Sequence, residues 1–156
     1  MDVGGHNSYV VSVLPEYTDA GLLPPGQHKA SWVDVCVRFG GNLRRDSLLA
    51  GLVRAATNLH NAGAVVLWLD GSFVTNKPEP NDFDGAWDPW GVDLTKVDPI
   101  LLDPSPAGRL RQKVKYGGEL FVHIEGASGM PFQHFFQQTP DGQVKGIVLL
   151  NLRTLP

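Results

Sequence analysis

The sequence contains one cysteine, and that scarcity limits the chemistry open to the chain. Cys36 is the only cysteine among 156 residues, so an internal disulfide and a cysteine-rich metal site are both excluded. Its apolar sequence context, VDVCVRF, favours a buried, inert thiol over a nucleophile. We therefore expect a cytoplasmic protein, since a reducing compartment is the simplest setting for a chain with a single unpaired cysteine.

Long apolar runs and an excess of basic charge are also missing. No stretch approaches the roughly 18 apolar residues that a membrane-spanning helix requires. The first residues, MDVGGHNSYVVSVLPE, lack the basic start and long apolar core of a signal peptide. The formal net charge of -3 argues against a dedicated nucleic-acid-binding protein but leaves a local basic patch open. We expect no membrane partner and no strong binding to duplex DNA.

The remaining composition is that of a small globular domain. Hydrophobic residues make up 42% and charged residues 19% of the chain, and the length suits one core. The 18 glycines and 12 prolines predict many short elements joined by specific turns. We expect one domain over residues 1–156, with an irregular N-terminal segment over residues 1–30.

Capping signals and apolar periodicity predict the helices and strands. Ser31 and Asp34 resemble a capping box, and Asn42 is placed to cap a second helix. The predicted elements are helices from residue 31, over 43–61, over 105–116 and over 131–138, and strands over 64–70, 82–87, 118–126 and 143–152. This order is typical of a mixed α/β (α+β) fold with a small mixed sheet and flanking helices.

Two aspartates near the middle of the chain form the strongest candidate site. Asp82 and Asp84 stand two residues apart in a predicted strand, so their side chains project from one face. Their repulsion favours a cation such as Mg²⁺ (or Mn²⁺), which binds carboxylate oxygens and completes its shell with water and substrate phosphate. Upstream, Gly71 permits close approach of a ligand, and Ser72 adds a hydroxyl to turn amides that can bind phosphate. The alternative is that both aspartates only cap turns around the nearby prolines.

The joint spacing resembles a known signature. Gly71-Ser72 is followed by nine residues and then Asp82-Phe83-Asp84, which resembles the motif of the DNA-polymerase-β-like nucleotidyltransferase superfamily. The resemblance implies a metal-bound nucleoside triphosphate beside the Gly-Ser turn and a third carboxylate on a later strand.

For the third carboxylate we prefer Glu119, with Glu125 on the same strand face as the alternative. Together with Asp82 and Asp84, Glu119 would then be both a metal ligand and a catalytic residue. The implied reaction is transfer of a nucleoside monophosphate to a hydroxyl, with release of pyrophosphate. Lys77, in the intervening loop, is a candidate for neutralising the triphosphate.

The acceptor stays open between a protein, an RNA and a small molecule. The helix predicted over residues 105–116 carries basic residues that alternate by two and therefore divide between opposite faces. This division does not support an RNA-binding stripe. The residues concerned are Arg109, Arg111, Lys113 and Lys115.

A closer resemblance covers most of the chain. The segments Leu23 to His28, Arg38 to Gly40, Asp70 to Thr75 and Lys145-Gly146 together resemble a family of small, largely uncharacterised prokaryotic and phage proteins in that superfamily. Small proteins of that superfamily also occur as one member of a toxin–antitoxin or phage-defence pair. The alternative function is therefore a catalytically weak nucleotide-binding or interaction protein of a toxin–antitoxin or phage-defence system.

Overall fold

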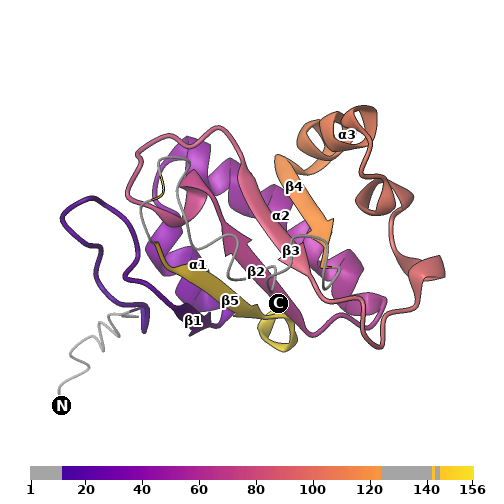
Figure 1. Ribbon diagram of the computed structural model, residues 1–156, viewed down its shortest axis with the longest axis horizontal. Coiled ribbons are helices and arrows are strands. Elements are labelled where there is room, and N and C mark those ends of the chain that lie inside the picture. The colour runs from indigo at the N-terminus through magenta and orange to yellow at the C-terminus, as the bar shows by residue number, and fades with distance from the viewer. Residues whose placement is uncertain (1–11, 124–141, 143–144) are drawn as a thin grey trace, which may run out of the picture.

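In the described part of the chain, a five-stranded sheet and three helices form the fold (Figure 1). The structure is a computed structural model that describes residues 12–123, 142 and 145–156. The strands are β1 (Gln27–Ala30), β2 (Val66–Asp70), β3 (Phe83–Trp87), β4 (Gly118–Val122) and β5 (Ile147–Asn151). The helices are α1 (Trp32–Phe39), α2 (Leu43–Asn61) and α3 (Pro106–Tyr116), and short 3-10 turns span Ser72–Val74, Leu94–Lys96, Pro99–Leu102 and Leu152–Thr154.

The sheet has the strand order β1-β5-β2-β3-β4 and is mixed. β2 runs antiparallel to both β3 and β5, whereas β1 is parallel to β5 and β3 is parallel to β4. The predicted mixed α/β class is therefore confirmed. The helix predicted over residues 131–138 lies outside the described residues.

One strand falls where we expected irregular structure. β1 occupies residues 27–30, within the segment 1–30, and pairs with β5 from Gln27 opposite Ile147 to Ala30 opposite Leu150. Its sequence, QHKA, has neither the length nor the apolar pattern of a buried strand. Hydrogen bonding to the distant β5, rather than local propensity, determines its conformation.

The three predicted helix starts that fall within the described residues are confirmed. Ser31 and Asp34 form a reciprocal capping box, in which the Asp34 N–H donates to Ser31 Oγ at 3.1 Å and the Ser31 N–H to Asp34 Oδ2 at 2.9 Å. Asn42 Oδ1 accepts from the Arg45 N–H at 2.8 Å at the start of α2. Ser105 caps α3 by accepting from the Gly108 N–H at 3.1 Å.

The two faces of the sheet have different roles. Leu67, Leu69 and Leu150 are fully buried on one face, in a core that also contains residues of α1 and α2. Figure 1 shows these two helices behind the sheet, with α3 beyond β4. Since side chains alternate along a strand, Asp70 and Asp84 project from the opposite face. No helix in the described ranges has both the length and the apolar character to cross a bilayer.

The buried arginine at the start of α2 anchors the loop between β2 and β3. Arg45 is only 6% exposed, and its side chain donates to four carbonyl groups. The acceptors are the carbonyls of Phe39 at 3.0 Å, Phe73 at 2.8 Å, Thr75 at 2.7 Å and Lys77 at 2.6 Å. The guanidinium also lies 5.6 Å from the centre of the Phe73 ring. The path of the loop is thereby fixed from the helix side.

Two neighbours of Arg45 continue this anchoring to the end of the loop. The Asn42 amide donates to the Pro78 carbonyl at 2.8 Å. Arg44 donates to the carbonyls of Pro80 at 2.9 Å and Asn81 at 2.8 Å. The residues that immediately precede Asp82 are therefore held by the first turn of α2.

We expect Arg45→Met to lower the free energy of unfolding by about 3 kcal/mol, because buried carbonyl oxygens lose a charged donor. Arg45→Lys should recover only part of this loss, since an ammonium lacks the planar fork of donors. Chemical denaturation measures both. The matched control is Arg111→Met, an exposed side chain 3.8 Å from Asp103, which should change stability by less than about 1 kcal/mol. Equal stability of the Arg45→Met variant and the control would contradict the anchoring role.

Candidate functional site

Three carboxylates lie side by side on neighbouring strands. In the register of the sheet Asp70 is opposite Asp84, and Asp84 is opposite Glu119. Asp82 lies immediately before β3, two residues from Asp84, and contributes to the same electrostatic environment. We call Asp70, Asp82, Asp84 and Glu119 the acid row. The structure thus brings together all three predicted metal ligands, whereas Glu125 lies outside the described residues.

The predicted phosphate-binding turn lies directly against this row. Gly71 has a φ of 78°, and a Cβ added to it would lie 2.5 Å from Asp84 Oδ2. Only glycine therefore fits between the turn and the Asp84 carboxylate. Ser72 follows in a 3-10 turn, half-buried, and its carbonyl accepts from Thr75 Oγ1 at 2.7 Å. Gly71 and Asp84, one from the turn and one from the acidic pair, are thus adjacent in the structure.

Lys77 lies in the loop between the Gly-Ser turn and Asp82, and its part as a triphosphate ligand stays a prediction. It is exposed, its carbonyl is bound by Arg45, and its N–H donates to Thr75 Oγ1 at 3.2 Å. No ion pair among the described residues joins its ammonium to the acid row. Its described contacts are those of a loop residue held through its backbone.

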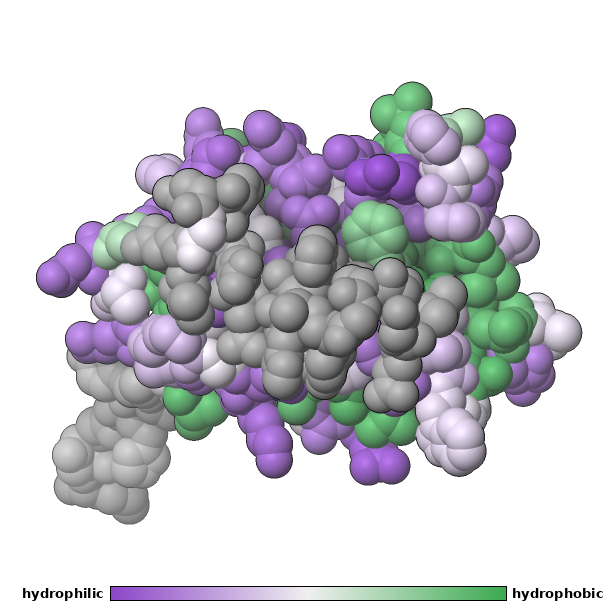
Figure 2. Space-filling model, in the orientation of Figure 1, coloured by the Kyte–Doolittle hydropathy of each residue, from purple (hydrophilic) through white to green (hydrophobic). Residues whose placement is uncertain are grey.

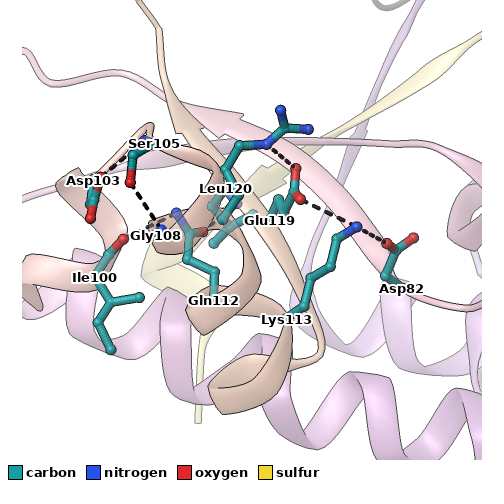
Figure 3. A network of polar contacts seen from close by, with 10 residues as sticks. Asp82, Ile100, Asp103, Ser105, Gly108, Gln112, Lys113, Glu119 and Leu120 are labelled. Atoms are coloured by element: carbon teal, nitrogen blue, oxygen red, sulfur yellow. Dashed lines mark hydrogen bonds and ion pairs between the residues drawn. The ribbon is translucent and has the colours of Figure 1, made fainter.

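Basic side chains neutralise part of the acid row, and Figure 3 shows one of them, Lys113, reaching both Asp82 and Glu119. Lys113 Nζ lies 3.4 Å from Asp82 Oδ2 and 3.3 Å from Glu119 Oε1. Arg109 Nε donates to Glu119 Oε2 at 3.2 Å. On β5's side of the sheet, Lys145 Nζ pairs with Asp70 Oδ1 at 2.7 Å, and both side chains are buried.

The predicted division of basic residues on α3 is correct but incomplete. Arg111 pairs with Asp103 and Lys115 with Asp98, away from the acid row. Arg109 and Lys113, four residues apart, share the face that points to Glu119. This i, i+4 spacing is the signal in the sequence from which the two residues could have been found.

The orientation of α3 depends on a buried glutamine. Gln112 is 2% exposed; its amide donates to the Ile100 carbonyl at 3.2 Å, and its oxygen accepts from the Leu120 N–H at 2.8 Å. Figure 3 shows this side chain between the turn before α3 and β4. Because it ties α3 to the strand that carries Glu119, it also fixes the positions of Arg109 and Lys113.

The charge of the acid row is not fully balanced. The four carboxylates of the acid row face three cations, Arg109, Lys113 and Lys145. Of these four, Asp84 alone has no ion pair within the described part of the chain. Burial, and then the neighbouring charges of Asp82, Glu119 and Asp70, raise the pKa of Asp84 to about 7, against an opposing effect of Lys113. The row therefore disfavours a full set of ionised carboxylates in the absence of another cation.

A divalent ion fits this donor set in part. Mg²⁺ is usually held by one or two carboxylates together with water and substrate phosphates, which Asp82 and Asp84 can provide. Within residues 12–123, 142 and 145–156, however, no group of three or more His, Cys, Asp or Glu side chains is arranged to hold a metal ion. The ammonium of Lys113 lies between Asp82 and Glu119. Glu119 is thus near the predicted site but is engaged by cations of the protein itself.

We expect the stability of the metal-free protein to fall as the pH rises from about 4 to about 7. Asp84 holds its proton in this range when folded and releases it when unfolded, so folding becomes less favourable until both states are ionised. Asp84→Asn should remove this trend and be more stable than the wild type at pH 8 by on the order of 2 kcal/mol, allowing for partial solvation. Denaturation curves at several pH values in chelator test this. The exposed Asp88→Asn is the control, and an unchanged pH dependence in Asp84→Asn would contradict the expectation.

We expect Lys145→Met to destabilise the protein by about 3 kcal/mol, because it leaves the Asp70 carboxylate buried without its partner. Burial already raises the pKa of Asp70, and Lys145 opposes that rise. The double variant Asp70→Asn with Lys145→Met should be more stable than Lys145→Met alone. A double-mutant cycle, built from free energies of unfolding in denaturant, measures the coupling between the two residues. Strictly additive changes in these free energies would show that the ion pair does not contribute to stability.

Comparison with known proteins places the chain in a family without assigning an activity. No curated protein and no solved structure matches it. A protein-family model matches residues 15–151, a range that includes the Gly-Ser turn, the acid row and Lys145. The chain therefore belongs to DUF6932, a family of unknown function.

Proposed function

We propose that this protein is a Mg²⁺-dependent nucleotidyltransferase-like enzyme that transfers a nucleoside monophosphate from a nucleoside triphosphate to a hydroxyl group. One observation carries the proposal. Asp84, with no ion pair among the described residues and with a pKa of about 7, lies against the Gly71 turn and beside the strand of Glu119. This is a place where one more positive charge, next to a turn able to bind phosphate, relieves a defined electrostatic strain.

The roles of the residues follow from their positions. Asp82 and Asp84 would hold Mg²⁺, which when bound neutralises phosphate charge and lowers the barrier to displacement at phosphorus. The Gly71-Ser72 turn would offer the Ser72 hydroxyl to the phosphates, whereas the Gly71 N–H already bonds the Asp70 carboxylate. Arg45 and Arg44 act at a distance by holding the loop carbonyls between this turn and Asp82.

The reaction is an in-line displacement. The acceptor oxygen forms a bond to the α-phosphorus while the bond from that phosphorus to the bridging oxygen breaks, so pyrophosphate leaves with the electron pair. The acceptor proton must pass to a base or to water. Glu119 already accepts a hydrogen bond from Arg109 and forms an ion pair with Lys113. It can therefore act as a third metal ligand only if the Lys113 ammonium moves away from its carboxylate.

A second candidate function is favoured by Lys113. Its ammonium already lies between Asp82 and Glu119, so a protein cation occupies part of the space that a second metal ion would need. On this basis the protein would bind a nucleotide without efficient transfer and act through a partner. Lys113 is only partly buried, with 44% of its side chain exposed, so the space can be vacated by rotation of the side chain.

We expect nucleoside triphosphates to bind more tightly with Mg²⁺ than with excess chelator, because the acid row repels free triphosphate. Calorimetric titration of ATP, GTP, CTP and UTP measures this. Asp82→Asn and Asp84→Asn should each weaken the Mg²⁺-dependent binding by about tenfold or more, equivalent to roughly 1.4 kcal/mol. Pyrophosphate release, with and without cell lysate as the source of acceptor, then measures transfer.

The control is Asp19→Asn, which removes an exposed carboxylate from the segment before β1 and should leave binding unchanged. Pyrophosphate release that disappears in Asp84→Asn supports the enzyme. Saturable Mg²⁺-dependent binding with no release supports the nucleotide-binding alternative. Equal affinity with Mg²⁺ and with chelator overturns both.

A further inference from the structure

A polar cavity opens between α2 and α3, beside the acid row, and its lining does not include the Gly-Ser turn. Its volume is about 570 Å³, within the range of roughly 300–1,000 Å³ typical of small-molecule sites. We call it the α2–α3 groove. Small residues of α2 form part of its lining, and four basic residues flank them: Arg44, Arg54, Lys113 and Lys115.

The groove exists because the two helices approach closely at one point. A Cβ added to Gly51 would lie 1.6 Å from the Tyr116 carbonyl oxygen, so no larger residue permits this packing. Arg54 strengthens the contact by donating to the Lys115 carbonyl at 2.7 Å, and its guanidinium lies 5.6 Å from the Tyr116 ring centre. The helical part of the lining is therefore held in place by helix packing, and the loop before β3 adds Asn81 and Asp82.

The charge of the groove is opposite to that of the whole chain. Four cationic side chains and one carboxylate, Asp82, line it, whereas the chain carries a net charge of -3. Asp98 and Glu119 pair with the two lysines, and even with these included the cations outnumber the carboxylates by four to three. The excess is carried by arginines, whose charge does not depend on pH near neutrality.

Both arginines retain hydrogen-bond donors for a ligand. A guanidinium has five N–H donors. The described contacts use two of them in Arg44 and one in Arg54, all to neutral carbonyl oxygens. These contacts position the guanidinium groups without neutralising them, which is the arrangement that recognises phosphate oxygens.

We infer that the α2–α3 groove is a binding site for a phosphate-bearing small molecule. The cationic lining supplies the affinity, and the cavity volume matches a ligand of nucleotide or sugar-phosphate size. Asp82 belongs both to the groove and to the acid row, so a ligand bound here lies next to the candidate reaction centre. The inference does not depend on nucleotidyl transfer, because anion binding in the groove requires neither Mg²⁺ nor Asp84.

A nucleic-acid strand is a poorer match for this groove. Proteins that track single strands combine positive charge with exposed aromatic rings on which bases stack. The aromatic residue that lines this groove, Tyr116, is 5% exposed and lies next to the Arg54 guanidinium. The described lining thus offers phosphate contacts but no free stacking surface.

Inorganic pyrophosphate, titrated calorimetrically in excess chelator, is the probe. We expect saturable binding that weakens as sodium chloride is added, because exposed charges are screened. Arg54→Gln should weaken binding by about tenfold, since one charged donor group is lost, whereas Arg54→Lys should retain part of the affinity. Arg54 is exposed, and circular dichroism checks that each variant is folded.

Two comparisons locate the site. Arg111→Gln, on α3 but outside the groove lining, should leave pyrophosphate affinity unchanged. Asp84→Asn should leave it unchanged or strengthen it in chelator, although the same variant loses Mg²⁺-dependent nucleotide binding under the proposed function.

Absence of pyrophosphate binding, or equal loss in Arg54→Gln and Arg111→Gln, overturns the inference. A 12-nucleotide single-stranded RNA is titrated in the same way. If it binds more tightly than pyrophosphate, and Arg54→Gln abolishes that binding, the small-molecule assignment is overturned.

Discussion

The contacts of one buried guanidinium connect the helical layer to the candidate site. Arg45 donates to the carbonyl groups of Phe73, Thr75 and Lys77, in the Gly-Ser turn and the loop that follows it. This loop determines where β3 begins. A loop of this length, with two prolines and no regular structure after Val74, has no internal ladder of hydrogen bonds to define its path. Its carbonyl groups must find donors elsewhere, and the first turn of α2 supplies them. The position of Asp82 is thus a consequence of hydrogen bonds from α2 side chains to the loop as much as of strand pairing.

Register between strands is the second constraint. Asp70, Asp84 and Glu119 come from three different strands, and their adjacency arises because β2, β3 and β4 pair without offset at these residues. A shift of one residue in either pairing would move a carboxylate to the buried face, where Leu69 and Leu120 now pack. The apolar core therefore holds the acids together by fixing the register of the strands. Gly71 contributes locally by leaving room for the Asp84 carboxylate.

The features that could be predicted from the sequence are the local ones. The capping residues Ser31, Asn42 and Ser105 act within a few residues of themselves, so their patterns identified the helix starts correctly. Alternation along a strand likewise identified the face of Glu119. β1 was not found, because its conformation depends on pairing with β5 more than a hundred residues later. The ion pairs of Lys145 and Lys113 were also missed, since they join elements whose relative placement no local pattern encodes.

Lys113 is the residue at which the two candidate sites meet. Its ammonium pairs with Asp82 and Glu119, it lines the α2–α3 groove, and these pairings raise its pKa, so it stays charged throughout the neutral range. A cation entering the acid row would repel this ammonium, whereas an anion entering the groove would attract it. Both events favour the same displacement, away from Asp82 and into the groove. Occupation of the groove by a phosphate-bearing molecule would therefore make the carboxylates of Asp82 and Glu119 more available to a metal ion, and the two binding events would assist each other by simple charge balance.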